Sequence, residues 1–193
     1  MKTFDLFVVE LKKLTNDTIT TESGMELYID TKYNEFEHRV TEGPVVAVPF
    51  KYDTGVSVGD TLYFHHLVVM NNGQPLTGKD DHYLVRYTPE HTVNNQAIAY
   101  KNKEGEISPL GGWVLLTPVE EDAPTQNSSI EVVSFSTPTV TKGRLAFATK
   151  ETQDLSIKEG DVVGFPVNRD YSLSIDGDEY YRVRAEDLLY VED

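Results

Sequence analysis

The chain repeats a short pattern of residues at an interval of about one hundred positions. Residues 56–64, which read VSVGDTLYF, return as residues 157–165, which read IKEGDVVGF, and Gly59 and Gly160 are 101 positions apart. Two further matches occur in the same order along the chain: residues 43–48 with 143–148, and residues 83–86 with 181–184. Solenoid units are shorter than this, roughly 20–50 residues. The repeat therefore predicts two tandem copies of one small domain.

The length of the chain suits this division. It has 193 residues, and a domain of roughly 95 residues can bury a core of its own. Residues 101–106 are mostly charged or polar and contain Gly105, which is typical of a connecting loop. We therefore expect a first domain over residues 1–102 and a second domain over residues 106–193.

Short runs of β-forming residues fill both copies. In the first copy they are residues 7–9, 45–50, 62–70 with a break at His65 and His66, 83–87 and 97–100. In the second copy they are residues 113–116, 145–147, 162–167, 180–184 and 188–191. Apart from these runs, no segment of ten or more residues has helical periodicity. Short strands separated by turns indicate a barrel or a sandwich. We predict an all-β fold made of two small β-barrels.

The charge of the chain excludes some classes of partner. It has 32 acidic and 17 basic residues and a net charge of −15. Phosphate backbones are bound by clustered Lys and Arg, so we expect no nucleic acid. No run approaches the roughly 18 apolar residues that span a bilayer, and the first residues lack signal or transit character. We therefore expect no membrane partner and a cytoplasmic location.

The sequence contains no convincing site for chemistry. There is no cysteine, which excludes thiol nucleophiles and thiolate metal sites. His65 and His66 are adjacent, and neighbours on a strand point to opposite faces, so we expect no metal there or at His82 with Asp80 and Asp81. Residues 176–179 lack the spaced ligands of a calcium loop and predict a hairpin turn. We expect no cofactor, no catalytic residue and no enzyme activity.

An ordered set of motifs runs through the second half. It consists of SPLGGWVLL from Ser108, TKGRLA from Thr141, LSIKEGDVVGF from Leu155 and RAEDLLYVE from Arg184. This order resembles the GroES-like co-chaperonin family, in which an Arg-Pro-Leu strand, a mobile loop, an Arg-Gly-x-Val strand, a Gly-Asp element and an Asp-Ile-Leu-Ala strand follow one another. The first half resembles the family more loosely, through residues 7–11, 43–48 and 56–64. The tandem arrangement is similar to the double-domain co-chaperonins of chloroplasts, and strongly divergent phage-encoded co-chaperonins offer another comparison.

The resemblance implies a segment that binds a partner. In the family, a loop that is disordered when free lays a short apolar hairpin into a groove of the chaperonin ring. The matching segment of the first copy consists of Gly24, Met25, Glu26, Leu27, Tyr28 and Ile29. Its alternative interpretation is an ordinary edge strand joined by polar loops. The equivalent stretch of the second copy, whose role is harder to assign because it has no glycine, contains Ile130, Val132, Val133 and Phe135.

The sequence departs from the family pattern at two places. The family has a β-hairpin, the roof, after its second strand. Only residues 49–55 and 149–154 fill that space here, so we predict that both barrels lack the roof hairpin. In addition, Glu26 interrupts an anchor that is usually aliphatic.

Two functions follow from these observations. The resemblance implies a homo-oligomeric, ring-forming protein that caps or modulates a chaperonin ring. The alternative is a virion structural protein, such as a collar, ring or decoration subunit, because a fold does not fix a function. A third hypothesis, a β module that binds carbohydrate or peptide, rests only on the 11 tyrosines. The one tryptophan, Trp113, is expected in the core or at a domain interface.

Overall fold

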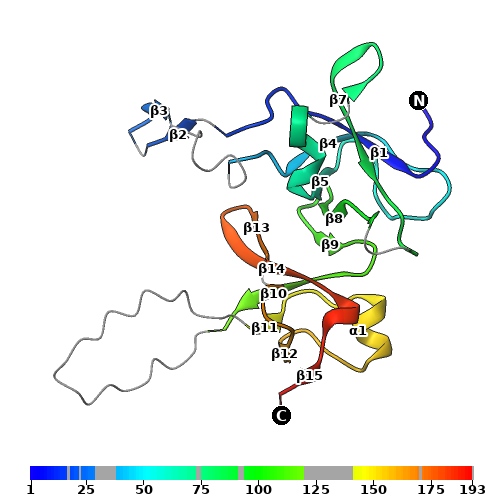
Figure 1. The fold of residues 1–193 in the computed structure, drawn as a ribbon, viewed down its shortest axis with the longest axis vertical. Helices are drawn as coiled ribbons and strands as arrows, with labels where there is room; N and C mark the ends of the chain where they lie inside the picture. The colour runs from blue at the N-terminus through cyan, green and yellow to red at the C-terminus, as the bar shows by residue number, and fades with distance from the viewer. Residues whose placement is uncertain are drawn as a thin grey trace. The chain divides into compact units, whose positions relative to one another are not determined.

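The computed structural model describes residues 1–16, 18–21, 23–28, 38–72, 75–90, 94–119, 141–169 and 171–192, with only the backbone at residues 19–20 and 70–72. Its contacts divide the chain into two compact units, Met1–Gly111 and Gly112–Asp193. Each unit holds one large antiparallel sheet and an apolar core, and β-strands make up most of the regular secondary structure of the described residues (Figure 1). The all-β fold class is confirmed.

The sheet of the first unit contains seven strands. In spatial order they are β6 (Pro75–Leu76), β7 (Lys79–Arg86), β1 (Leu6–Glu10), β4 (Glu42–Ala47), β5 (Thr61–Phe64), β8 (Ala97–Lys101) and β9 (Ile107–Pro109). Its core includes Phe7, Leu62, Phe64 and Val85, which are fully buried. Burying each such side chain contributes roughly 1.5–3 kcal/mol, so these strands are held mainly by their inward faces.

The sheet of the second unit contains six strands. In spatial order they are β13 (Tyr171–Ile175), β14 (Asp178–Arg184), β10 (Trp113–Pro118), β11 (Lys142–Leu145), β12 (Val162–Gly164) and β15 (Tyr190–Val191). Val114, Leu145 and Val163 lie at the centre of its core. The same spatial order is found in the other sheet. There β6, β7, β1, β4, β5 and β8 occupy the places that β13, β14, β10, β11, β12 and β15 occupy here.

The repeated Gly-Asp pattern builds the same turn in both units. Gly59 and Gly160 have positive φ angles of 95° and 91°, a region in which glycine avoids the strain of a side chain. One carboxylate oxygen of Asp60, and likewise of Asp161, accepts the backbone N–H of the residue three positions earlier at 2.8 Å. The aspartates therefore close both turns in the way that the sequence predicts for turn residues.

The predicted β run over residues 62–70 is wrong in its second half. β5 ends at Phe64, and η2 (His66–Asn72) is a 3-10 helix. The His65 ring accepts the N–H of Leu67 at 3.1 Å, a local bond that competes with strand pairing. The helical turn also directs Val68 and Val69 into the core. Burial of these two side chains overrides their β propensity.

The connections that follow β4 and β11 contain no roof hairpin. Residues 48–60 and 146–161, which the structure describes in full, have no paired strands apart from a single bridge of Pro49 to Thr3. The second connection holds a five-residue helix, α1 (Lys150–Asp154), that the sequence did not predict. Its signal is short: the side chains of Thr149 and Thr152 form a reciprocal capping box at its first turn.

Two further loops have a local explanation. Asp176 and Gly177, with φ angles of 55° and 94°, form the turn between β13 and β14, which confirms the predicted hairpin turn. Residues 102–106, where the sequence places the domain junction, form the turn between β8 and β9, and the Asn102 side chain accepts the N–H of Glu106 at 2.8 Å. The division by contacts falls after Gly111. A second 3-10 helix, η4 (Ala185–Asp187), follows β14.

A candidate partner-binding hairpin

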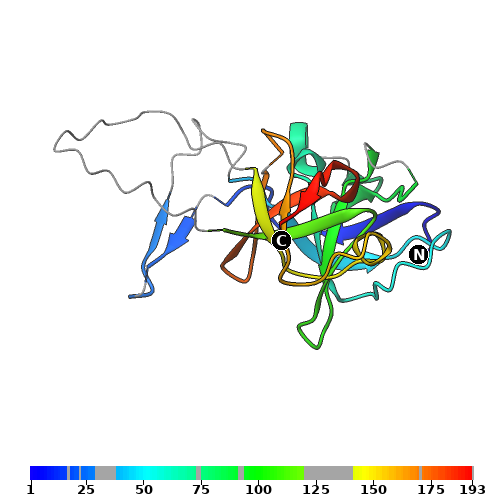
Figure 2. The same cartoon turned by 90° about the horizontal axis from the view of Figure 1, so that it is seen from below.

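Two short strands of the first unit form a sheet of their own. β2 (Thr18–Thr20) pairs antiparallel with β3 (Glu26–Tyr28), and neither strand joins the seven-stranded sheet (Figures 1 and 2). The stem of this hairpin is held by backbone bonds, from Val40 N–H to the Leu14 carbonyl at 2.9 Å and from Asn16 N–H to the His38 carbonyl at 2.6 Å. β3 therefore lies outside the main sheet, as one strand of a separate two-stranded sheet.

The tip of the hairpin is closed by Thr21 and Gly24. Thr21 N–H donates to the Met25 carbonyl at 2.9 Å, Gly24 N–H donates to the Thr21 carbonyl at 2.8 Å, and the Thr21 hydroxyl oxygen accepts Met25 N–H at 3.1 Å. Gly24 has a φ angle of 80° and no atom within 4 Å of the place where a Cβ would stand. Glycine is therefore favoured here by backbone conformation and not by crowding.

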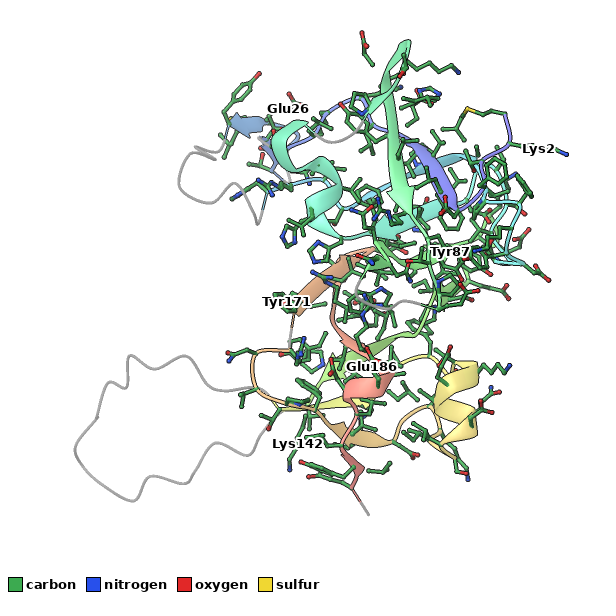
Figure 3. All side chains as sticks on the ribbon, turned by 45° about the vertical axis from the view of Figure 1, so that its right-hand side comes forward. Lys2, Glu26, Tyr87, Lys142, Tyr171 and Glu186 are labelled. Atoms are coloured by element: carbon green, nitrogen blue, oxygen red, sulfur yellow. The ribbon has the colours of Figure 1, made fainter. Side chains whose placement is uncertain are left out.

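Large apolar side chains of this hairpin are exposed to solvent. The exposed fraction is 60% for Met25, 48% for Leu27 and 82% for Tyr28. Successive strand residues point to opposite faces, so neither face of β3 is packed against the core. A two-stranded hairpin is marginally stable by itself, and exposed apolar side chains that gather in one place are typical of a partner-binding surface. Figure 3 labels Glu26 on this strand.

Some of the predicted site residues can be placed and others cannot. Gly24, Met25, Glu26, Leu27 and Tyr28 lie together on the tip and outer strand of the hairpin. Ile29 lies outside the described residues, and so do the predicted residues of the second copy, Ile130, Val132, Val133 and Phe135.

Comparison with known proteins identifies the family. No family model matches the chain. A segment covering 45% of the chain is 37% identical, over 93 residues, to the protein named Co-chaperonin GroES from Coprothermobacter proteolyticus, and it spans 94% of that protein. The chain belongs to the GroES co-chaperonin family. The matching segment is less than half of this chain but nearly the whole of that GroES protein, so the comparison covers one GroES-sized part of the chain.

The histidines of this GroES-family chain do not form a metal centre in the described residues. No group of three or more His, Asp or Glu side chains in that part of the chain is arranged to hold a metal ion. The rings of His65 and His66 lie 4.2 Å apart, which corrects the expectation that they point to opposite faces. That expectation assumed a continuous strand, whereas His66 begins η2.

A cation–aromatic stack on the second sheet was not foreseen from the sequence. The guanidinium carbon of Arg184 lies 3.4 Å from the centre of the Trp113 ring, and that of Arg182 lies 5.5 Å from Trp113 and 5.2 Å from Tyr171. Burial lowers the pKa of Arg182 and of Arg184 to about 10. Trp113 is buried on β10 directly opposite Arg184 on β14. The sequence does contain a signal for this stack. Arg182 and Arg184 are two positions apart, and residues at that spacing on a strand share a face.

The remaining features add no further site. The described residues contain no helix that is long and apolar enough to cross a membrane. Asp81 and His82 form a pair, with 2.6 Å between a carboxylate oxygen and the ring Nδ1.

Proposed function

We propose that the chain consists of two GroES-like copies and acts as a ring-forming co-chaperonin that caps or modulates a chaperonin ring. Residues 24–29 of the first copy bind the chaperonin, and residues 130–135 of the second copy have the same role or act as a spacer. The observation that carries this proposal is the hairpin tip, which exposes Met25, Leu27 and Tyr28 away from the core of its own unit.

Matching backbone bonds support the two-copy arrangement. Phe64 N–H donates to the Thr41 carbonyl at 2.8 Å, and Phe165 N–H donates to the Thr141 carbonyl at 2.8 Å. The same positions of the repeat therefore make the same contacts in both sheets. Together with the matching strand order, these contacts argue for a duplicated unit and against a chance likeness of short motifs.

The energetics of the hairpin suit reversible capping. Ordering a flexible segment costs conformational entropy, so one hairpin with few anchors binds weakly. The thioether of Met25 adapts to irregular apolar grooves. A ring that presents several hairpins at once recovers affinity through multivalency and still releases when single contacts open. In this role the chain needs no cofactor and no catalytic residue, and it works in the cytoplasm.

Titration calorimetry with a chaperonin ring and nucleotide tests the proposal. We expect heat of binding for the natural chain and its loss for Leu27→Asp, because a charge cannot enter an apolar groove without a partner. Val58→Asp is the matched control, since Val58 is 54% exposed in the same unit but outside the hairpin. No heat with the natural chain, or equal heat with Leu27→Asp, overturns the proposal.

A second candidate function is a virion structural protein built on the same fold. It is favoured by the connections at residues 48–60 and 146–161, which are described in full and lack the roof hairpin. A subunit of a collar or a decoration ring needs a self-associating barrel and no chamber lid. Mass spectrometry of purified virus particles separates the two functions, because only the structural role places the chain in the particle.

A further inference from the structure

The hairpin formed by β2 and β3 belongs to a segment that carries only negative charge. Residues 15–31 contain four acidic residues and no Lys, Arg or His. The acidic residues are Asp17, Glu22, Glu26 and Asp30. Glu26 is exposed on β3 (Figure 3), and no described Lys or Arg forms an ion pair with it. The charge of this segment is therefore not neutralised by basic residues of its own.

Glu26 shares a face of the hairpin with an aromatic ring. Alternate residues of a strand point to the same side, so Glu26 and Tyr28 lie on one face of β3 and Leu27 lies on the other. Tyr28 is 82% exposed. The register places Thr20 opposite Glu26 and Thr18 opposite Tyr28. This face therefore offers a carboxylate and an aromatic ring at strand positions roughly 7 Å apart.

The second copy repeats this order of residue types in its sequence. Residues 25–27 read MEL and residues 130–132 read IEV, so an acidic residue stands between two apolar ones in both copies. Residues 120–140, which lie outside the described part of the chain, also contain four acidic residues and no Lys, Arg or His. A groove that is apolar throughout disfavours a central Glu, because burying an unpaired charge is costly. The repeated Glu favours a partner that compensates its charge.

We propose that Glu26 and Tyr28 bind a Lys or Arg side chain at the rim of the chaperonin groove, while Leu27 enters the apolar part of that groove. A carboxylate forms a charge-assisted hydrogen bond with either cation, and either cation stacks on the face of an aromatic ring. The inference rests on the proposed function and adds the charge of the partner, a groove bordered by basic residues. Complementary charge selects a partner and speeds its encounter. The hairpin therefore discriminates between chaperonins by the charge of their grooves.

Calorimetry with Glu26→Gln tests the sign of this contact. Each chain is titrated into a chaperonin ring with nucleotide. We expect Glu26→Gln to raise the dissociation constant about 3- to 10-fold, because the amide keeps the shape of the side chain and loses its charge. Glu104→Gln is the matched control and should leave the dissociation constant unchanged, since Glu104 is exposed in the same unit but outside the hairpin.

Glu26→Val separates this contact from a groove that is apolar throughout. Valine removes the charge and adds an apolar side chain that suits a strand, and we expect it to bind more weakly than the natural chain. Tighter binding of Glu26→Val, or equal or tighter binding of Glu26→Gln, overturns the inference. The dissociation constant of the natural chain should also rise more steeply with salt than that of Glu26→Gln, because salt screens rim charges. Equal salt dependence overturns the inference as well.

Two variants of Tyr28 test the aromatic part. Tyr28→Phe keeps a ring and should bind like the natural chain, whereas Tyr28→Leu removes the ring and should bind more weakly. Equal affinity of these two variants overturns the stacking on Tyr28. Failure of the inference is distinct from failure of the proposed function. No heat with the natural chain removes both, and heat whose affinity Glu26→Gln does not weaken removes only this inference.

Discussion

At the scale of single residues, the Asp81 and His82 pair shows how a local contact makes stability depend on pH. The hydrogen bond with the His82 ring lowers the pKa of Asp81 below the ordinary value of 3.8. A carboxyl whose pKa is lower in the folded state stabilises the fold above its unfolded pKa. That contribution is lost as the pH falls through the folded-state value.

Removal of the partner ring should therefore raise the pKa of this carboxyl. We expect His82→Ala to return the pKa of Asp81 toward 3.8, because the largest cause of its depression is then absent. Carbon-13 NMR titration of the carboxyl groups measures the change. His38→Ala, at a histidine on the stem of the hairpin, is the control. An Asp81 pKa that stays depressed in His82→Ala would show that another group is responsible.

At the scale of elements, α1 and the β2–β3 hairpin illustrate two ways of closing a short segment. α1 is held at its start by the Thr149 hydroxyl, which accepts Thr152 N–H at 3.2 Å, while Thr149 N–H donates to the Thr152 hydroxyl at 2.8 Å. The hairpin is closed by Thr21 and by the positive φ of Gly24. Thr152 is fully buried, whereas the residues of β3 are exposed. α1 is therefore anchored to its unit, and β3 remains accessible to a partner.

Loss of the cap should destabilise the second unit measurably. We expect Thr149→Ala to lower the free energy of unfolding by about 1 kcal/mol, because the N–H of Thr152 loses its acceptor. Thr149→Ser keeps a hydroxyl in place and should change the free energy of unfolding much less. Urea unfolding followed by fluorescence of Trp113, the only tryptophan, measures both. Equal stability of the two variants would show that the hydroxyl is not the stabilising group.

At the scale of the whole molecule, the described residues form an apolar core in each unit, and each core belongs to the sheet of its own unit. Phe64 is fully buried in the first core. We expect Phe64→Ala to destabilise the first unit by about 3–5 kcal/mol, since it leaves a cavity in a packed core. Trp113 lies in the second unit. The urea midpoint measured by its fluorescence should therefore stay unchanged. Hydrogen exchange at β1 should show the loss, and a Trp113 midpoint that shifts equally would mean that the units unfold together.

Local chemistry explains the parts of the fold that could be predicted from the residues. The Gly-Asp turns at Gly59 and Gly160, the Asp176 turn and the buried alternation in β4 each depend on a few neighbouring residues. Positive φ angles, aspartate caps and period-two burial act over short distances. The family resemblance and the position of the exposed hairpin tip were available from sequence for the same reason, because both are carried by short contiguous motifs.

Contacts between distant residues decided the rest. Residues 66–70 belong to a predicted β run and lie in the 3-10 helix η2, because burial of Val68 and Val69 outweighs a local preference. The stacking of Arg184 on Trp113 joins residues 71 positions apart and depends on the register of β14 on β10. Likewise, the cover of β8 by β9 is a property of strand order, which arises only when the chain folds into a sheet.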